Sequence, residues 1–520
     1  MSETFYITTP IYYVNDAPHI GHSYTTIAAD VLARYHRLQG RDVFFLTGTD
    51  ENASKVAAAA AERGVEPQQH CDEFCAHFRS LWQELNISND DFIRTTEPRH
   101  TRRVQSIVQQ LLDRDQIYLG KYEGWYDPGQ EEFVTELAAR EHDYTSAISG
   151  RPLVRYAEPS YFFKLTAWTD RLLGHIQAHP EFIQPTSRRN EVVSKVTAGV
   201  EDLCISRSSL DWGVVMPNDP GHRVYVWIDA LSNYLTALGL PEIGDEHDGE
   251  SAKYWPADVH LIGKDILWFH TVYWPCMLMA LQVELPRTVF AHGWWTSEGK
   301  KMSKSLGNFI SREVIAEICR DYSRDVFRYF LLREVPFGQD GDFSRQALKT
   351  RYNTELANDL GNLLSRSLKM IGLYFDAAVP SPQARALEGE PAKFLAEPVE
   401  RIAAETPALM AGCRFSEYLR VVLELAAATN RCIDATGPFR LAKDPAQRER
   451  LGTILYGCAE AVRIVLSCLE PFMPEKAAAG LAQLGLSGRD AEPLRERVKW
   501  GRLVPGTAVA ASGPLFPRRQ

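Results

Sequence analysis

The sequence predicts an α/β protein with a doubly wound parallel sheet, split by a mostly β insertion and followed by an α-helical bundle. Three observations predict it. Apolar, strand-like runs alternate with helical patterns near the N-terminus and again in the middle of the chain. Short, aromatic, turn-rich segments separate these two halves. Helical periodicity dominates from residue 344 almost to the end.

The first half of the sheet is predicted by four consecutive segments. Residues 4–13 and 42–49 read as buried strands, and a helix-like run, 22–38, lies between them. Residues 52–64 read as a helix that ends at Gly64, because glycine accepts the left-handed conformation common at helix ends. Strand, helix, strand and helix open a nucleotide-binding, Rossmann-like domain.

The second half of this domain follows an insertion. Residues 117–163 have the aromatic, turn-rich composition of short strands, and the α/β pattern resumes at 223–235, 258–274 and 288–295. One nucleotide-binding domain is therefore predicted to be split. The predicted parts are the first half of the catalytic domain (1–116), an inserted connective domain (117–215), the second half (216–290), a lysine-rich loop with its connecting region (291–345), a helical domain (346–500) and a C-terminal tail (501–520).

Composition restricts the class of protein. The 520 residues are 45% hydrophobic and 24% charged, which is ordinary for a globular protein of several domains. A net charge of −10 argues against indiscriminate polyanion binding, although a local basic face would still serve a nucleic-acid partner. Nine scattered cysteines form no disulfide framework. We expect no membrane span, no signal peptide and a cytoplasmic location.

Two segments contain the residues that we expect to bind phosphate groups. "PHIGHS" (18–23) lies between a strand and a helix, where helix N–H groups attract phosphates, and His19 and His22 can donate hydrogen bonds to them. Gly21 would let a nucleotide approach the backbone. "EGKKMSKSLGN" (298–308) supplies lysines in a short loop. Each alone is weak, because such histidines and lysine-rich loops are common on surfaces, but the pair in this order is specific.

The pair resembles the "HIGH" and "KMSKS" signatures of class I aminoacyl-tRNA synthetases. "TTPIYYVNDAPHIGH", "FLTGTDE", "YVWIDALSNYL", "LIGKDILWFH" and "HGWWTSEGKKMSKS" further resemble the methionyl-tRNA synthetases over essentially the whole chain. The chain is too short for the editing insertion of the valyl, leucyl and isoleucyl enzymes. It lacks the zinc-ligand cysteines expected around the pocket of a cysteinyl enzyme.

The resemblance implies a methionine-tRNA ligase. Such an enzyme activates L-methionine with ATP to methionyl-adenylate and pyrophosphate, and then transfers methionyl to the 3′ end of methionine tRNA, both initiator and elongator. It implies that His19, His22, Lys301, Lys304 and Arg207 act in catalysis, and that His19, Gly21, His22, Asp265 and Lys304 bind ATP with Mg²⁺. The implied methionine pocket consists of Ile11, Tyr13, Asp50, Trp227, Leu231, Tyr234, Ile266 and His270.

The helical domain would then bind the anticodon through Asn362, Arg366 and Phe439, and Phe439 stands where the family usually has tryptophan. In two other places the chain departs from the family. Asn52 and Ala53 replace the usual His-Gly. Residues 117–163 contain no cysteine, with Asp127 and Gln130 at places where many relatives have zinc ligands, so we expect no zinc.

The chain stops soon after the predicted bundle, and we expect a monomer without an appended tRNA-binding module. Two other classes stay open at this point. One is a small-molecule adenylyltransferase of the same superfamily, which would not need the helical domain. The other is a synthetase-like RNA-binding protein without catalysis, which would be expected to have lost His19, His22 or Lys304.

Overall fold

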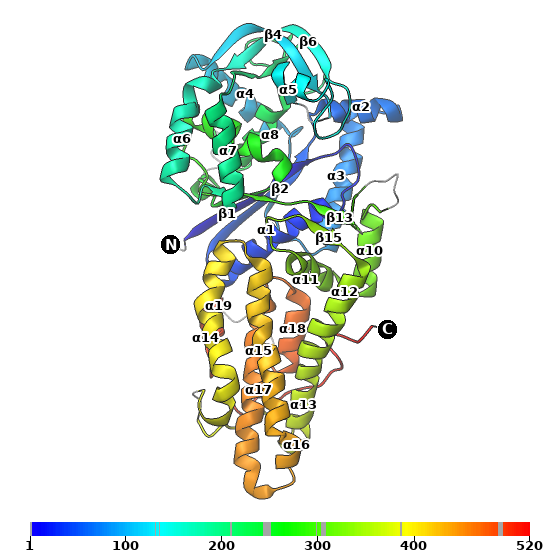
Figure 1. Ribbon diagram of the computed structural model, residues 1–520, viewed down its shortest axis with the longest axis vertical. Helices are drawn as coiled ribbons and strands as arrows, with labels where there is room; N and C mark the ends of the chain where they lie inside the picture. Colours follow the sequence, from blue (N-terminus) through cyan, green and yellow to red (C-terminus); the bar gives the residue numbers. More distant parts are fainter. Residues whose placement is uncertain are drawn as a thin grey trace.

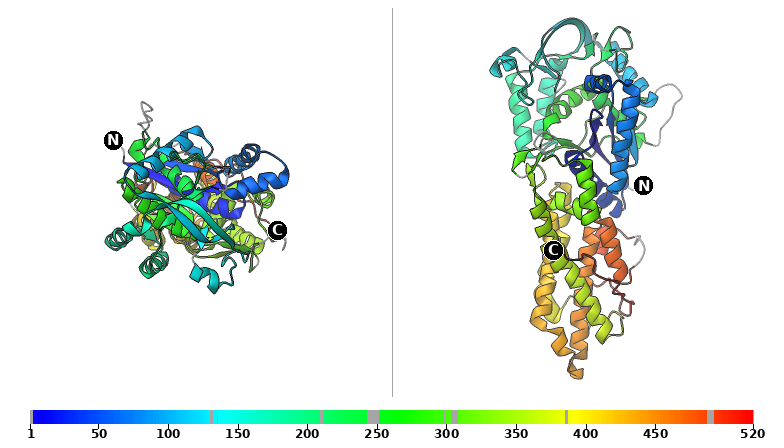
Figure 2. Two further views of the ribbon diagram at one scale, coloured as in Figure 1. Left: turned by 90° about the horizontal axis from the view of Figure 1, so that it is seen from above. Right: turned by 90° about the vertical axis from the view of Figure 1, so that its right-hand side faces the viewer.

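The computed structural model describes residues 3–129, 132–134, 136–208, 211–242, 251–297, 299–302, 308–384, 387–486 and 492–519. An upper lobe contains the parallel sheet and the insertion, and an elongated helical bundle extends below it (Figure 1). The side view shows the same separation of the two lobes (Figure 2). The predicted fold class, a split doubly wound domain followed by a helical bundle, is confirmed.

The central sheet has six parallel strands in the order β3-β2-β1-β11-β12-β7. The strands are β1 (Thr4–Tyr13), β2 (Asp42–Asp50), β3 (Asp91–Arg94), β7 (Ile183–Gln184), β11 (Val259–Gly263) and β12 (Val289–His292). The chain runs outward from β1 through β2 to β3 on one side and from β11 to β12 on the other. The carboxyl ends of these two strands therefore form the topological switch point, where ligands of doubly wound sheets bind.

Helices cover this sheet and connect its strands. They are α1 (Ile20–Leu38), α2 (Ser54–Arg63), α3 (Pro67–Glu84), α4 (Pro98–Asp113), α8 (Val226–Thr236) and α9 (Trp274–Leu281), with the short turns η2 (Ala252–Tyr254), η3 (Lys264–Ile266) and η4 (Phe269–Tyr273). α2 ends where the sequence predicts, because Gly64 adopts φ 67° and its N–H caps the last turn.

The insertion forms a four-stranded antiparallel sheet in the order β5-β4-β6-β8. Its elements are β4 (Ile117–Asp127), β5 (Glu132–Val134), α5 (Glu136–Glu141), β6 (Val154–Phe163), η1 (Leu165–Trp168), α6 (Thr169–Ala178), α7 (Thr186–Ala198) and β8 (Leu203–Cys204). β7 falls within the predicted range 117–215 but pairs with β12 in the central sheet. We therefore propose that this range returns to the catalytic domain before its end.

A small sheet and two helices connect the catalytic and helical parts. β13 (Trp295–Ser297) pairs with β14 (Lys300–Lys301) and β15 (Gly341–Phe343), while β9 (Ser206–Arg207) pairs with β10 (Arg223–Val224) nearer the insertion. The two helices are α10 (Arg312–Asp321) and α11 (Arg324–Glu334).

The lower lobe is the predicted helical bundle. Its helices are α12 (Arg345–Arg351), η6 (Tyr352–Gly361), α13 (Asn362–Tyr374), α14 (Gly389–Ala411), α15 (Phe415–Thr436), α16 (Pro438–Leu441), η7 (Pro445–Gln447), α17 (Arg448–Leu469), α18 (Pro474–Gln483) and α19 (Leu494–Arg497). The tail packs back on this lobe through buried Leu503, Leu515 and Phe516.

One helix of the described chain, Pro445–Leu469, is long and apolar enough to cross a membrane by length and composition alone. Its most apolar window is 94% buried inside the structure. It lies among the other helices of the bundle (Figure 1). Such burial is typical of the core helix of a bundle.

A buried arginine joins the two lobes. Arg328 of α11 pairs with Asp30 of α1 at 2.6 Å, and both side chains are fully buried. Its guanidinium also donates to the carbonyl oxygens of Leu85, Pro471 and Phe472 at 3.0–3.3 Å. Five hydrogen-bond donors in a rigid fork suit such a junction, which connects the helix behind the nucleotide motif to the loop between α17 and α18.

We expect Arg328→Met to destabilise the protein by about 3–5 kcal/mol, because it removes one of the two arginines paired with the buried Asp30 and leaves three carbonyl oxygens without this donor. The matched control is Arg345→Met, whose ion pair with Glu317 is about half exposed and should be worth less than about 1 kcal/mol. Urea unfolding followed by circular dichroism measures both. Equal losses of stability in the two variants would contradict this role for Arg328.

Candidate active site

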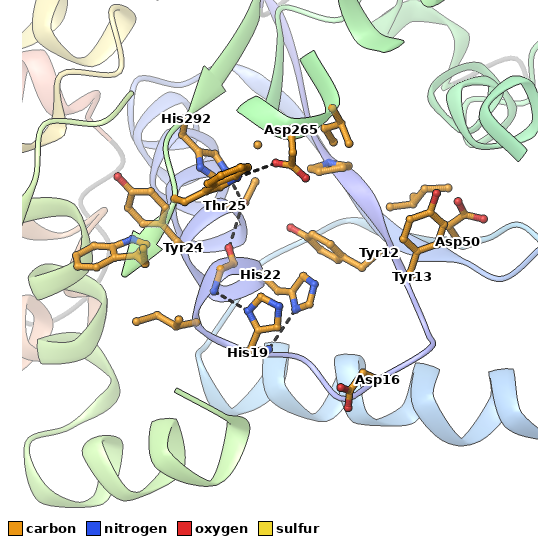
Figure 3. A pocket seen from close by; sticks show the side chains of 18 of the residues that line it. Tyr12, Tyr13, Asp16, His19, His22, Tyr24, Thr25, Asp50, Asp265 and His292 are labelled. Carbon is orange, nitrogen blue, oxygen red and sulfur yellow. Dashed lines mark hydrogen bonds between the residues drawn. The ribbon is translucent and has the colours of Figure 1, made fainter. Parts of the chain in front are cut away.

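A cavity of about 570 Å³ opens at the switch point of the sheet. Figure 3 shows the side chains that line it, with His19 beside His22 and Asp50 beside Tyr13. Twelve residues singled out from the sequence line this one cavity: Ile11, Tyr13, His19, Gly21, His22, Asp50, Trp227, Leu231, Tyr234, Asp265, Ile266 and His270. Segments far apart in the chain therefore meet where the fold class predicts a ligand.

His19 and His22 cap the N-terminus of α1 reciprocally. His19 Nδ1 accepts from the Gly21 N–H at 3.0 Å, and His22 Nδ1 accepts from the His19 N–H at 3.1 Å. A neutral imidazole that accepts through Nδ1 carries its proton on Nε2, so the capping assigns both tautomers. Each neutral ring then carries an Nε2–H donor, and the helix terminus adds a partial positive charge suited to phosphate oxygens.

The charge state of His22 agrees with this assignment. Burial, with a smaller contribution from the neighbouring His19, holds the pKa of His22 well below 6.5. The two ring centroids are 4.0 Å apart, so two imidazolium ions side by side are disfavoured. The local structure also explains why residue 21 is glycine, because a Cβ there would lie 2.9 Å from Cε1 of His19. Glycine is thus needed for the His19 ring to fold over the helix end.

Asp265 faces the cavity from the turn that follows β11. Its Oδ1 accepts a hydrogen bond from Nε1 of Trp294 at 3.1 Å. A Cβ on Gly263 would lie only 2.4 Å from that same oxygen, so the glycine lets the carboxylate fold back over the strand end. Lys264 stacks over the Trp294 ring at 4.3 Å and pairs with Asp340 at 2.7 Å. Asp265 is therefore oriented, with acceptor capacity left for hydroxyl groups.

The other end of the cavity is apolar, with one buried acid. Asp50 ends β2, is paired in register with Tyr13 and is only 3% exposed. Trp227 stacks on Phe269 with ring centroids 3.7 Å apart. Soft aromatic and aliphatic walls of this kind suit a thioether, and a buried carboxylate suits an ammonium group.

A hydrogen-bonded pair closes this apolar end. His270 Nδ1 lies 3.0 Å from the carbonyl oxygen of Ile266 and must donate to it, so Nε2 accepts from the Tyr234 hydroxyl at 2.7 Å. Burial lowers the pKa of His270 to about 4, against the opposing effect of the Ile266 carbonyl. Both groups are therefore neutral at physiological pH.

We expect acid to destabilise the protein in the window from about pH 6.5 down to about pH 4. His270 has a lower pKa folded than unfolded, so the unfolded chain binds more protons there, and stability falls as the pH falls. His270→Gln should reduce this loss, because glutamine does not titrate. Urea unfolding at pH 4.5 and pH 7.5 measures the difference, and the same loss in parent and variant would contradict it.

The structure does not place three of the residues that the sequence assigns to catalysis in the cavity. Among the residues that the structure describes, Arg207 does not line the cavity. It is 3% exposed, with its guanidinium 4.1 Å from the ring centroid of Tyr126 and 5.8 Å from that of Tyr225. Lys304 and the side chain of Lys301 lie outside the described part of the chain. The backbone of Lys301 pairs with Thr296, a residue of the cavity wall.

His292 and Trp294 are among the lining residues that sequence reasoning did not single out. His292 ends β12, donates through Nδ1 to the Gly293 carbonyl at 2.7 Å and accepts through Nε2 from Thr25 Oγ1 at 2.6 Å. Trp294, which orients Asp265, is 42% exposed at the rim. His292 ends a buried strand and Trp294 follows it, so the rule that ligands bind at the carboxyl ends of parallel strands would have indicated both.

A family model for class I tRNA synthetases (M) matches residues 5–142 and 136–368. The methionine–tRNA ligase of Caldanaerobacter subterraneus subsp. tengcongensis is 48% identical over 520 residues, which are 100% of this chain and 79% of that protein. The Rickettsia felis methionine–tRNA ligase is 43% identical over 519 residues, 100% of this chain and 99% of the relative. The chain belongs to the methionine–tRNA ligase family.

Solved structures of family members agree with this assignment. Mycobacterium tuberculosis methionyl-tRNA synthetase in complex with methionyl-adenylate has a TM-score of 0.92 and 41% identity, and the match covers 99% of this chain and 100% of that one. The free form of the same enzyme has a TM-score of 0.85 and 39% identity, over 100% and 99% of the two chains.

The residues expected to read the anticodon lie in the bundle. Asn362 is exposed at the start of α13, and Arg366 pairs with Asp434 near the end of α15 at 3.1 Å. Phe439 lies on α16, five residues after Asp434, and is 47% exposed. Figure 1 places α13 and α16 near each other in the lower part of the bundle. Phe439 is therefore not part of the buried core of the bundle.

The two departures from the family pattern have local explanations. Asn52 is engaged by hydrogen bonds to Thr95 and Asp229, and Ala53 is fully buried at the start of α2. Asp127 accepts from the Gly129 N–H at 2.7 Å, whereas Gln130 lies outside the described residues. Within the described residues no group of three or more His, Cys, Asp or Glu could hold a metal ion.

Proposed function

We propose that the chain is an ATP-dependent methionine–tRNA ligase that works through the cavity at the switch point. The observation that supports this proposal is that one cavity contains two chemically different ends. Phosphate-directed donors lie at the start of α1, and an apolar pocket with a buried carboxylate lies beyond them. An adenylyltransferase for a small molecule would not need the bundle, and a binding protein would not need the capped histidine pair.

In the first step a carboxylate oxygen of methionine attacks the α-phosphorus of ATP, and the bond from that phosphorus to pyrophosphate breaks. The Nε2–H groups of His19 and His22 donate to phosphate oxygens as charge develops there, which is stabilisation by preorganised donors. Lys301 and Lys304 are proposed to neutralise the departing pyrophosphate, and Asp265 accepts from ribose hydroxyls. In the second step a terminal ribose hydroxyl of the tRNA attacks the methionyl carbonyl, and AMP leaves.

The amino acid is held at the other end of the same cavity. Asp50 pairs with the substrate ammonium. The methionine side chain lies among Ile11, Tyr13, Trp227, Leu231, Tyr234, Ile266 and His270. Sulfur–aromatic contacts are worth about 0.3–1.5 kcal/mol each. Arg207, buried against Tyr126 of β4, is better placed to position the insertion than to touch substrate.

Mg²⁺ fits this site as the counter-ion of the ATP phosphates, because it is usually bound by phosphate oxygens and water with few protein ligands. When bound, it supplies charge neutralisation for the polyphosphate. Zinc is not expected, since residues 117–163 contain no cysteine and a single histidine, His142. Elemental analysis of the purified enzyme tests this, and stoichiometric zinc in the insertion would contradict it.

The exposed Phe439, with Asn362 and Arg366, is proposed to bind the anticodon of methionine tRNA. Single-stranded bases are read by stacking on an aromatic face and by hydrogen bonds to their edges. Phe439→Ala is expected to raise the KM for tRNA by about ten- to a hundredfold, because base stacking is worth about 1–3 kcal/mol. Aminoacylation kinetics measure it, and activation of methionine without tRNA should be unchanged.

The matched control is Leu373→Ala, which truncates another exposed apolar residue of the bundle, 66% exposed on α13. It should leave the KM for tRNA within about twofold. Phe439→Trp should charge tRNA at least as well as the parent, because the larger ring keeps the stacking face. Normal charging by Phe439→Ala would place anticodon recognition elsewhere.

The proposed function is tested by aminoacylation of purified tRNA. The expected result is that the enzyme with ATP and Mg²⁺ esterifies methionine to both initiator and elongator methionine tRNA. It should leave tRNAs with other anticodons uncharged. Methionyl-adenylate formation without transfer to any tRNA would support a small-molecule adenylyltransferase instead.

Monomeric state and cytoplasmic location stay predictions from the sequence. Light scattering coupled to size-exclusion chromatography tests the first, with an expected mass near the 58.7 kDa of one chain. Fractionation of cells that produce the full chain tests the second. A dimer or a membrane-bound fraction would contradict them.

A further inference from the structure

The two faces of α8 have different partners. One face lines the cavity through Trp227, Leu231 and Tyr234. On the other face Asp229 and Thr236, two helical turns apart, both contact the buried His100 of α4. Asp229 Oδ1 accepts from His100 Nε2 at 2.8 Å, and Thr236 Oγ1 lies 2.7 Å from His100 Nδ1. The helix that forms the apolar wall of the pocket is thus anchored from behind.

The loop that carries Asp50 is joined to this anchor by one side chain. Asn52 follows Asp50 by two residues, and its Nδ2 donates both to Asp229 Oδ2 at 2.9 Å and to the Thr95 carbonyl at 3.1 Å. Thr95 also accepts, through Oγ1, from the Glu51 N–H at 2.9 Å. Asp229 therefore bonds to α4 with one carboxylate oxygen and to the Asp50 loop with the other.

We propose that the Asn52–Asp229 hydrogen bond sets the distance between the two ends of the methionine site, which makes Asn52 a positioning residue that selects substrate length. The inference rests on the proposed function, because it takes Asp50 as the partner of the substrate ammonium and α8 as the wall against the side chain. If the loop and the helix can separate, a substrate with one more methylene fits.

Length selection of this kind depends on rigid walls. A hydrophobic pocket discriminates against one extra methylene by about 10–200-fold, and misplacement of a bound group by 1 Å is enough to change rates greatly. Neither Asn52 nor Asp229 lines the cavity among the described residues, so an effect on selectivity must act through the distance between its two ends.

The experiment compares methionine with ethionine, which carries one more methylene on sulfur, in ATP–pyrophosphate exchange by the full chain. Asn52→Ala is expected to lower the ratio of kcat/KM for methionine to that for ethionine by about fivefold or more, with the KM for ATP unchanged. The matched control is Asn89→Ala, whose amide donates to the Asp91 carbonyl oxygen within its own loop, and which should keep the parent ratio.

Exchanging the charges of residues 52 and 229 distinguishes a positioning role of Asn52 from a packing role. Asn52→Asp sets two carboxylates against each other and should lower the ratio as well. Adding Asp229→Asn restores a hydrogen bond with donor and acceptor exchanged, and the new amide oxygen can still accept from His100, so the ratio should recover toward the parent. Packing alone would lower both kcat/KM values equally in Asn52→Ala.

An unchanged ratio in Asn52→Ala overturns the inference, as does an equal loss for both substrates. A parent enzyme that shows no methionine-dependent exchange would instead overturn the proposed function, so the two failures are distinguishable.

Discussion

Asp50→Asn is expected to weaken methionine binding by about ten- to a hundredfold while ATP binding stays within about twofold. The substitution keeps the shape of the side chain but removes the counter-charge for the substrate ammonium, and hydrogen bonds to charged groups are worth about 1.5–3 kcal/mol. Asp50 is only 3% exposed at the end of β2, so water cannot solvate the ammonium group in place of the lost carboxylate. Isothermal titration calorimetry with each ligand alone measures both affinities.

Asp16→Asn is the matched control, because Asp16 also lines the cavity but is half-buried and accepts from the Ala17 N–H of its own loop. Its methionine affinity should stay within about twofold of the parent. Equal weakening of methionine and ATP in Asp50→Asn would mean that the change is structural, and the assignment of Asp50 would fail.

The second large effect is expected at His22. His22→Asn should slow adenylate formation by about a hundred- to a thousandfold, the range seen when one preorganised donor to a developing charge is removed. The asparagine oxygen can still accept from the His19 N–H in place of Nδ1, so the helix cap is kept while the Nε2–H donor is lost. Rapid-quench measurement of the first turnover reports this step directly.

His22→Gln provides the comparison, because its longer amide places an N–H donor near the position of Nε2. It should retain more of the parent rate than His22→Asn, with methionine affinity unchanged in both. If the two variants react equally fast, the Nε2–H group has no part in adenylate formation.

Much of the fold is predictable because local patterns determine it. The strand predicted at 4–13 is Thr4–Tyr13, and the helix predicted to stop at Gly64 does so through a left-handed cap. The position of β7 could not be predicted. A strand of two residues carries no periodicity, and its pairing with β12 depends on residues more than a hundred positions away.

The features of the site also divide into those that the sequence predicts and those that it does not. Asp50 ends a strand and His19, His22 and Asp265 follow strands, and parallel strands bring their carboxyl ends to one edge of a sheet. The hydrogen bond from Asn52 to Asp229 spans 177 residues and joins a loop to the far face of a helix. No spacing in the sequence indicates such a contact, and it becomes visible only when the packing of α4 against α8 is known.

The measurement that tests the central claim most directly is ATP–pyrophosphate exchange by the purified enzyme with Mg²⁺ and each of the twenty amino acids in turn. The cavity combines phosphate donors, a buried carboxylate and a thioether-sized apolar pocket, so exchange should depend on methionine. The other nineteen should be poorer substrates by about 10-fold or more, because a hydrophobic pocket discriminates to that extent even against a single methylene. Exchange supported equally by another amino acid, or none with methionine, would contradict it.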